Sequence, residues 1–129
     1  MKAGELLKQI ELFLQYKEKS DKKHMPEDNA RIRISCEFNK LKVFYDLGSI
    51  VPIHFDNGCQ VLELSNYSDN CMSLNTLCNE LRENSDMDVS FIIYDDESNR
   101  ITGFGENDNF VININNHVPT TLYVNVEKW

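Results

Sequence analysis

The stretch VSFIIYDDESNRITGF (Val89–Phe104) contains two apolar segments separated by a short acidic one. The first segment, VSFIIY, is apolar at consecutive positions, which is typical of a strand covered on both faces. The segment DDESN consists largely of residues whose short side chains bond the local backbone in turns. RITGF then resumes a strand pattern. The stretch therefore predicts a β-hairpin and indicates that a sheet forms the centre of the fold.

The acidic segment of this hairpin could instead bind a metal ion. A calcium loop needs oxygen ligands at alternate positions, a central Gly and a distal Glu, and DDESNRITGFGE lacks both the alternation and the Gly in the required place. The three histidines, His24, His54 and His117, are far apart and do not have the spacing of zinc ligands. We therefore expect a turn rather than a metal site, and no metal or cofactor.

An amphipathic helix opens the first half of the chain, because its apolar residues recur at helical spacing and form one stripe. These residues are Leu6, Leu7, Ile10, Phe13 and Leu14. After a polar linker, RIRISCEF (31–38) alternates apolar and polar residues as a half-buried strand does. Two more strands are expected near KVFYDL (42–47) and at CQVLELSNY (59–67). Asn57-Gly58, just before the last of these, predicts a type I′ hairpin turn.

The second half of the chain repeats this order of elements. Ser73 is the expected N-cap of a second helix, and the strands that follow begin with VSFIIY and end with TTLYVNVE (120–127). The apolar stripe of this helix consists of Leu74, Leu77, Cys78 and Leu81. Aligning the two halves places Leu6 on Leu77, Ile10 on Leu81, Ile32 on Ser90 and Ile34 on Ile92.

These patterns predict an α+β fold of two tandem α-β-β-β units, with antiparallel strands and two helices packed on one face. With 129 residues, 41% of them hydrophobic, the chain can bury a core without a disulfide or a metal ion. We interpret residues 1–129 as a single domain in which residues 1–68 and 72–129 form an internal repeat.

The net charge of −8 is unevenly distributed along the chain. Residues 1–42 contain ten basic and seven acidic residues, whereas residues 43–129 contain three basic and fourteen acidic ones. Nucleic acids and anionic membranes are bound by clustered Lys and Arg, so the acidic part of the chain argues against both as ligands. It favours a basic protein partner.

The spacing of the cysteines and the hydropathy of the chain indicate in which cellular compartment the protein is found. The spacing of Cys36, Cys59, Cys71 and Cys78 is irregular, and cysteines on apolar positions of periodic segments behave as small hydrophobic residues. We therefore expect reduced thiols and a cytoplasmic protein. No apolar segment approaches the length of a membrane span.

No pattern in the sequence predicts catalysis, and we expect neither catalytic nor cofactor-binding residues. Gly103-Phe104-Gly105 is followed by a strand, whereas a phosphate-binding loop opens a helix. A nucleophilic cysteine needs an activating neighbour, and no such group stands beside the four cysteines. Acidic pairs serve as general acid and base only inside a cleft, and the acids in question belong to turns.

The segment SLNTLCNELRENSDMDVSFIIYDDESNRI resembles the opening of short proteins of bacteriophages and mobile elements, which begin with a capped helix, an acidic break and a strand ending in a charged turn. Ser73, Leu74, Leu77, Cys78, Leu81, Asp88 and Val89 carry this resemblance. It covers about 30 residues of the chain and implies a small phage-like or bacterial accessory protein. It implies no catalytic residues.

The function expected from the sequence is that of a small non-enzymatic protein-binding protein of bacterial or phage origin. It would act as an acidic inhibitor of a basic or nucleic-acid-handling partner. The candidate partner-binding residues are Asp95, Asp96, Glu97, Glu106 and Asp108. One alternative is a small-ligand binder or enzyme with a site between the two units. Another is a structural protein that forms homodimers through an uncharged strand edge such as FVININ (110–115).

Overall fold

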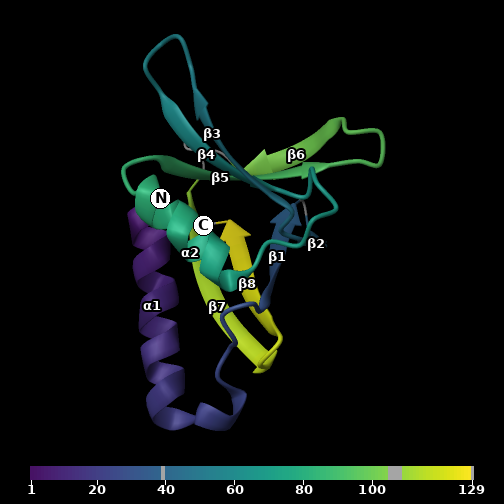
Figure 1. The fold of residues 1–129 in the computed structure, drawn as a ribbon. Helices are drawn as coiled ribbons and strands as arrows, with labels where there is room; N and C mark the ends of the chain where they lie inside the picture. The colour runs from purple at the N-terminus through teal and green to yellow at the C-terminus, as the bar shows by residue number, and fades with distance from the viewer. Residues whose placement is uncertain (39, 105–108, 129) are drawn as a thin grey trace.

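The computed structural model describes residues 1–38, 40–104 and 109–128, in which two α-helices, one short 3-10 helix and eight strands form an α+β fold (Figure 1). The predicted fold class is confirmed. The elements, in chain order, are α1 (Ala3–Ser20), η1 (Lys22–His24), β1 (Arg31–Phe38), β2 (Leu41–Asp46), β3 (Ser49–His54), β4 (Gln60–Ser65), α2 (Leu74–Glu83), β5 (Asp88–Tyr94), β6 (Arg100–Phe104), β7 (Phe110–Val118) and β8 (Thr121–Lys128).

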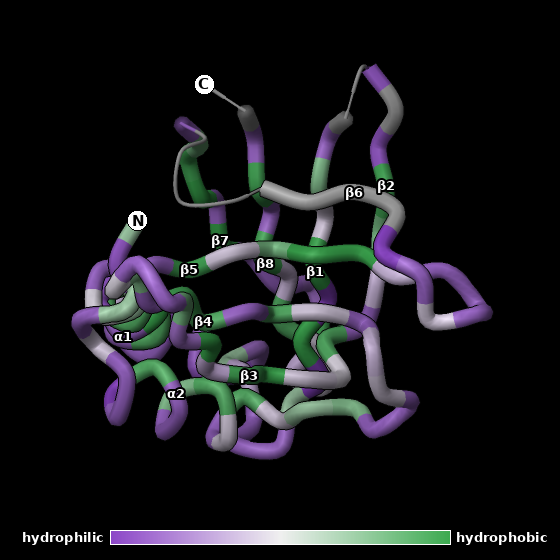
Figure 2. Tube along the Cα trace, turned by 90° about the horizontal axis from the view of Figure 1, so that it is seen from above, coloured by the Kyte–Doolittle hydropathy of each residue, from purple (hydrophilic) through white to green (hydrophobic). Residues whose placement is uncertain are grey.

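The eight strands form two sheets of four. We name the sheet with strand order β3-β4-β5-β6 sheet A and the sheet with order β2-β1-β8-β7 sheet B. Seen from above, the strands of the two sheets cross steeply, with α1 and α2 together at one side (Figure 2). The central pairs β4–β5 and β1–β8 are parallel, and the outer pairs are antiparallel. The expectation of antiparallel strands alone is therefore wrong, because strands from opposite halves of the chain pair in the middle of each sheet.

Each half of the chain contributes four strands, one more than the predicted α-β-β-β unit contains. The additional strand of the first half is β3, whose sequence SIVPIH contains Pro52. Proline lacks the N–H that a central strand must donate, so it is tolerated at a sheet edge. β3 lies at the edge of sheet A, where it pairs only with β4 among the described strands.

The two halves correspond to each other in topology. Replacing β1–β4 by β5–β8, and the reverse, converts the strand order of one sheet into that of the other. The starts of the helices follow the same rule: Lys2, just before α1, pairs with Asp88 of β5, and Ser73, just before α2, pairs with Arg31 of β1. Each helix therefore begins against the first strand of the other half. A common ancestry of the halves stays a prediction.

The core lies between the two sheets and under the helices. It contains alternate residues of the strands and the buried stripes of both helices. Its largest fully buried side chains include Leu6, Ile10, Ile32, Ile34, Leu62, Leu64, Leu77, Leu81, Phe91 and Leu122. The buried Tyr45 hydroxyl of sheet B donates a hydrogen bond of 3.0 Å to the Leu64 carbonyl of sheet A. Burial raises the pKa of Tyr45 well above its usual value, so this hydroxyl remains a donor.

The turn between β3 and β4 differs from the predicted type I′ turn. The Phe55 N–H bonds to the Cys59 carbonyl, which leaves a three-residue loop in which Gly58 has a φ of 88°. Asn57 does not have positive φ, although a type I′ turn requires it there. Instead the loop has the geometry of a three-residue hairpin with one left-handed residue. The β3–β4 hairpin extends beyond the body of the molecule (Figure 1).

Candidate functional site

The predicted acidic turn joins β5 to β6 as a hairpin turn, as the sequence indicated. The Asp95 carboxylate accepts hydrogen bonds of 2.9 Å from the N–H groups of both Glu97 and Asn99, which fixes the loop. Asp96 and Glu97 are exposed and form no ion pair with any described residue. Asp95 therefore has a structural role. The carboxylates of Asp96 and Glu97, in contrast, are available for a contact with a partner.

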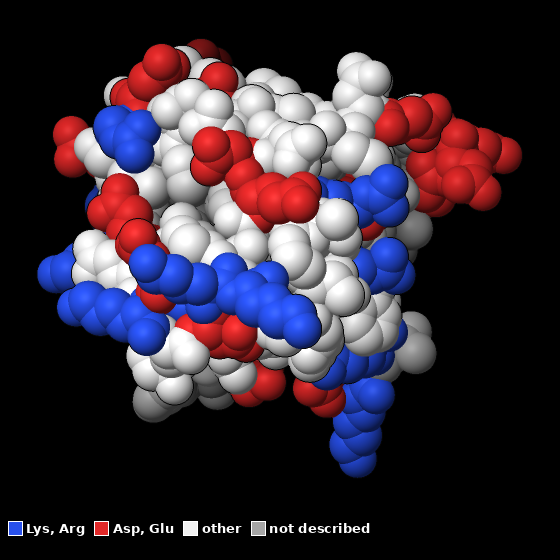
Figure 3. Space-filling view, turned by 60° about the horizontal axis from the view of Figure 1, so that its bottom comes forward, with Lys and Arg blue, Asp and Glu red and all other residues white. Residues whose placement is uncertain are grey.

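Two of the five candidate residues, Glu106 and Asp108, lie outside the described residues. The other three belong to the acidic turn, which is the distal end of the β5–β6 hairpin. In the space-filling view of Figure 3, acidic side chains project at the right edge, the side on which this hairpin lies in Figure 1. Basic side chains gather over the lower part of the same view. Acidic and basic side chains are therefore separated on this face of the molecule, as they are along the sequence.

A polar cluster connects the acidic turn to the rest of sheet A. The Tyr94 hydroxyl donates a hydrogen bond of 2.5 Å to the Glu63 carboxylate, and its ring packs edge-on against Tyr67 at 5.1 Å between centroids. The Asn66 amide donates to the Tyr94 carbonyl at 2.9 Å and accepts from the Tyr94 N–H at 2.7 Å. Asn66 thus fixes the chain that leaves β4 to the end of β5. The hydrogen bond to Glu63, together with burial, raises the pKa of Tyr94 to about 12.

We expect Tyr94, like the buried Tyr45, to ionise above the usual pKa of a tyrosine in an alkaline titration followed by tyrosinate absorbance. A raised pKa means that the protonated phenol stabilises the fold, so this stabilisation is complete below pH ~10 and is lost as the pH rises towards about 12. In Glu63→Gln the pKa of Tyr94 should fall towards the usual value, because the nearby negative charge is removed. Tyr94→Phe is the control that identifies the late transition. Identical titrations of the wild type and Glu63→Gln would contradict the prediction.

The outer face of sheet A, which faces the viewer in Figure 2, has none of the described helices over it. On this face β3 presents Val51, which is 45% exposed, and the half-buried Ile53, and the adjoining Phe55 is 51% exposed. Exposed apolar side chains that cluster on one element of a folded protein often mark an interaction surface. The sequence interpretation missed this group because it did not recognise β3 as a strand. The signal was SIVPIHF, in which Val51, Ile53 and Phe55 alternate.

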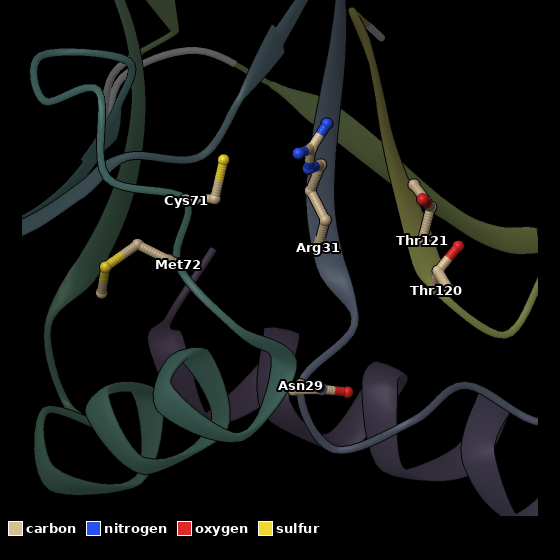
Figure 4. Close-up of a pocket in the computed structure, with 6 residues that line it drawn as sticks. All are labelled: Asn29, Arg31, Cys71, Met72, Thr120 and Thr121. Atoms are coloured by element: carbon tan, nitrogen blue, oxygen red, sulfur yellow. The ribbon is translucent and has the colours of Figure 1, made fainter.

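A polar pocket of about 390 Å³ lies between the two halves of the chain (Figure 4). Asn29 and Arg31 of the first half and Thr120 and Thr121 of the second line it, together with Cys71 and Met72 of the connection between the halves. A neighbouring pocket of about 240 Å³ shares Cys71 and includes Asp46. The sequence could not predict these pockets, because their residues are distant along the chain.

The chemistry of the larger pocket is that of hydrogen-bond donors around one positive charge. Arg31 is the only charged residue among those that line it. Its guanidinium lies 3.8 Å from Asp46, and that of Arg33 lies 3.7 Å from the same carboxylate. Asp46 Oδ1 is buried and accepts no hydrogen bond within the described part of the chain. Such a pocket could hold a small anion. Among the described residues that line it, Cys71 carries a thiol, but none is a His, Asp or Glu that could act as a base beside it.

All four cysteines are free thiols. Cys36 is buried in the core, and burial raises the pKa of its thiol to about 12. Burial also raises the pKa of Cys78. Since the thiolate is the nucleophile, neither residue is activated for catalysis.

Within residues 1–38, 40–104 and 109–128, no three His, Cys, Asp or Glu side chains converge as metal ligands would. No helix in these ranges is both long and apolar enough to cross a membrane.

No protein-family model, curated protein or solved structure matches the chain.

Proposed function

We propose that this chain is a non-enzymatic protein-binding protein whose contact surface is sheet A. The observation that carries the proposal is the exposure of Val51 and Phe55 on the β3–β4 hairpin, at the edge of a sheet whose outer face none of the described helices covers. Protein interfaces combine a buried apolar centre with a polar rim. In sheet A, β3 would supply the apolar centre, and the acidic turn would supply charge that selects the partner.

The charge of sheet A and its connections favours a basic partner. Asp96 and Glu97 are exposed without ion pairs to described residues, and they belong to residues 43–129, which contain fourteen acidic and three basic residues. Complementary charge accelerates association and excludes partners of the same sign. An inhibitor of a basic or nucleic-acid-handling protein, in a bacterial or phage cytoplasm, is the specific form of the proposal.

The experiment is affinity capture from a bacterial lysate at low and at high salt, with the bound protein identified by mass spectrometry. We expect a basic partner that high salt releases. Reversal of two charges in Asp96→Lys/Glu97→Lys should then weaken its binding by roughly tenfold or more. Asp95 is left unchanged because its side chain holds the turn.

The matched control is Glu18→Lys/Glu27→Lys, which changes the net charge equally at exposed positions of the first half. Equal weakening in both variants would show that only overall charge matters. Unchanged binding in Asp96→Lys/Glu97→Lys would remove the acidic turn from the proposal.

The second candidate is a small-ligand binder that uses the pocket between the halves. The observation in its favour is that residues of both halves line this pocket, and that they include Arg31, whose guanidinium lies 3.8 Å from the Asp46 carboxylate. Stabilisation of the fold by inorganic phosphate, lost in Arg31→Gln, would favour this candidate. The homodimer alternative uses the edge strand β7, but α1 packs beside that strand.

A further inference from the structure

The correspondence between the two halves is incomplete in one region. α1 has 18 residues and α2 has 10, so α1 continues beyond the point that corresponds to the end of α2. η1 and a linker follow α1, whereas α2 is followed almost directly by β5. The first half therefore contains a covering segment, which we define as residues 13–30, and the second half has no equivalent.

The covering segment packs against the hairpin of β7 and β8. α1 and η1 both contact β7. The Asn116 amide of β7 donates a hydrogen bond of 2.7 Å to the His24 carbonyl, and the Glu27 N–H donates one of 2.9 Å to the Pro119 carbonyl. As a result Asn116 is buried. The edge of sheet B is thus covered by the chain's own helix, which is a common means of protecting an edge strand.

The strand of the other half that corresponds to β7 is β3, since both are third strands and both lie at sheet edges. Among the described elements only β4 is in extensive contact with β3. Figure 1 shows the consequence: α1 runs beside β7, whereas the β3–β4 hairpin stands free at the top. Val51, Pro52 and Phe55 are exposed there, at the position where the covering segment would lie if the second half had one.

The chemistry of this uncovered edge limits what could fill it. Pro52 has no N–H, so an added strand could not form a continuous ladder along β3. A helix needs only apolar side chains, and β3 presents them from both faces of the sheet. The six residues of β3 span roughly 20 Å, which a helix of about 14 residues matches in length.

Two basic side chains in the region of the β3–β4 turn and the α2–β5 connection are already paired, Arg82 with Glu11 and Lys2 with Asp88. The charges there that have no ion pair to a described residue are negative. Asp56 lies in the β3–β4 turn, and Glu83 and Asp86 lie at the end of α2 and in its connection to β5; all three are exposed and form no ion pair with described residues. The register of sheet A places Ile53 of β3, through Val61 of β4, in line with the start of β5. The carbonyl end of α2 adds partial negative charge. A basic helix complements this environment.

We propose that the uncovered edge of β3 and the adjoining Phe55, together with the connection from α2 to β5, are a docking site for a basic amphipathic helix of a partner protein. The helix takes the place that the covering segment takes on β7. This inference rests on the proposed protein-binding function and specifies the partner element and its position.

The test is a titration of the isotope-labelled full chain with a synthetic amphipathic helix, followed by NMR. The probe is a Leu/Lys peptide of about 14 residues with leucine on one face. We expect shift changes in β3, in the β3–β4 turn and in Ser85–Asp88. Phe55→Ser should weaken binding by about tenfold. Tyr16→Ser, which alters a side chain that is 69% exposed on α1, is the matched control and should bind as the wild type does.

Two control peptides define the result further. A peptide of the same composition in scrambled order should bind much more weakly, and one with Glu in place of Lys should not bind. Shift changes confined to α1 or to the acidic turn, or equal binding of the scrambled peptide, would overturn the inference. Self-association of the chain that Phe55→Ser abolishes would also overturn it, because the occupant would then be a second copy.

The peptide titration is independent of the capture experiment, so the two failures can be told apart. A partner that the lysate supplies and that binds Phe55→Ser as well as the wild type overturns this docking site and leaves protein binding intact. Site-specific peptide binding without any captured partner counts against the proposed function alone.

Discussion

Residues 1–69 and 70–129, produced as separate polypeptides, should each be unfolded and should form the native structure only when mixed. Every sheet contains one hairpin from each half: sheet A joins β3–β4 to β5–β6, and sheet B joins β1–β2 to β7–β8. A separated half would lose both parallel pairings and expose the apolar inner faces of its two hairpins. An isolated hairpin is marginally stable in water at best. Circular dichroism and NMR of each half and of the equimolar mixture would check this.

The control for the separated halves is the intact protein cleaved between Asp69 and Asn70, two exposed residues of the connection. The cleaved protein should keep its fold, because its sheets do not depend on this peptide bond. Cooperative unfolding of either half alone as a monomer would show the prediction to be wrong. A folded homodimer of one half would also contradict it, and would support the predicted internal repeat.

The local elements of this fold could be predicted because their signals are local. The alternation of RIRISCEF predicted a strand, and β1 covers Arg31–Phe38. Ser73 was the expected cap of the second helix, and its hydroxyl accepts a hydrogen bond of 3.2 Å from the Thr76 N–H. The DDESN segment forms a turn in which Asp95 bonds its own loop. Each of these features depends on residues within a few positions of one another.

The pairing of the strands could not be predicted in this way. β1 pairs with β8, some ninety residues further along the chain, and nothing in either strand specifies the other. The alignment of the halves was also wrong by one residue at the first strands. Ile32 and Ile34 belong to the core cluster, whereas Ser90 and Ile92 lie on the opposite face of β5 from the core residues Val89 and Phe91. A one-residue slip exchanges the two faces of a strand.

The reason for that slip is that VSFIIY is apolar on both faces. Ile92 is almost fully buried although it does not belong to the main core cluster, so burial alternates too weakly along β5 to fix its register. The same limit applies to the candidate site. The acidic turn was visible in the sequence, but the exposure of Phe55 depends on which hairpins a helix covers, and that depends on the topology.

Phe91→Ala should lower the free energy of unfolding by about 3–5 kcal/mol, which is a large part of the stability of a domain this size. Phe91 is fully buried in β5, and its ring packs edge-on against Phe110 of sheet B with centroids 5.7 Å apart. Removing the ring leaves a cavity where the two sheets meet and deletes an aromatic contact between them. Urea unfolding followed by circular dichroism would measure the loss.

The matched control for Phe91→Ala is Phe55→Ala, which removes a phenyl ring from the exposed end of the β3–β4 hairpin. Here the free energy of unfolding should change by only about 0.5 kcal/mol, because little buried surface is lost. Equal losses in the two variants would mean that Phe55 is part of the packed structure. A large difference would mean instead that the fold does not need Phe55, and that its variants can be used to test docking on β3 without unfolding sheet A.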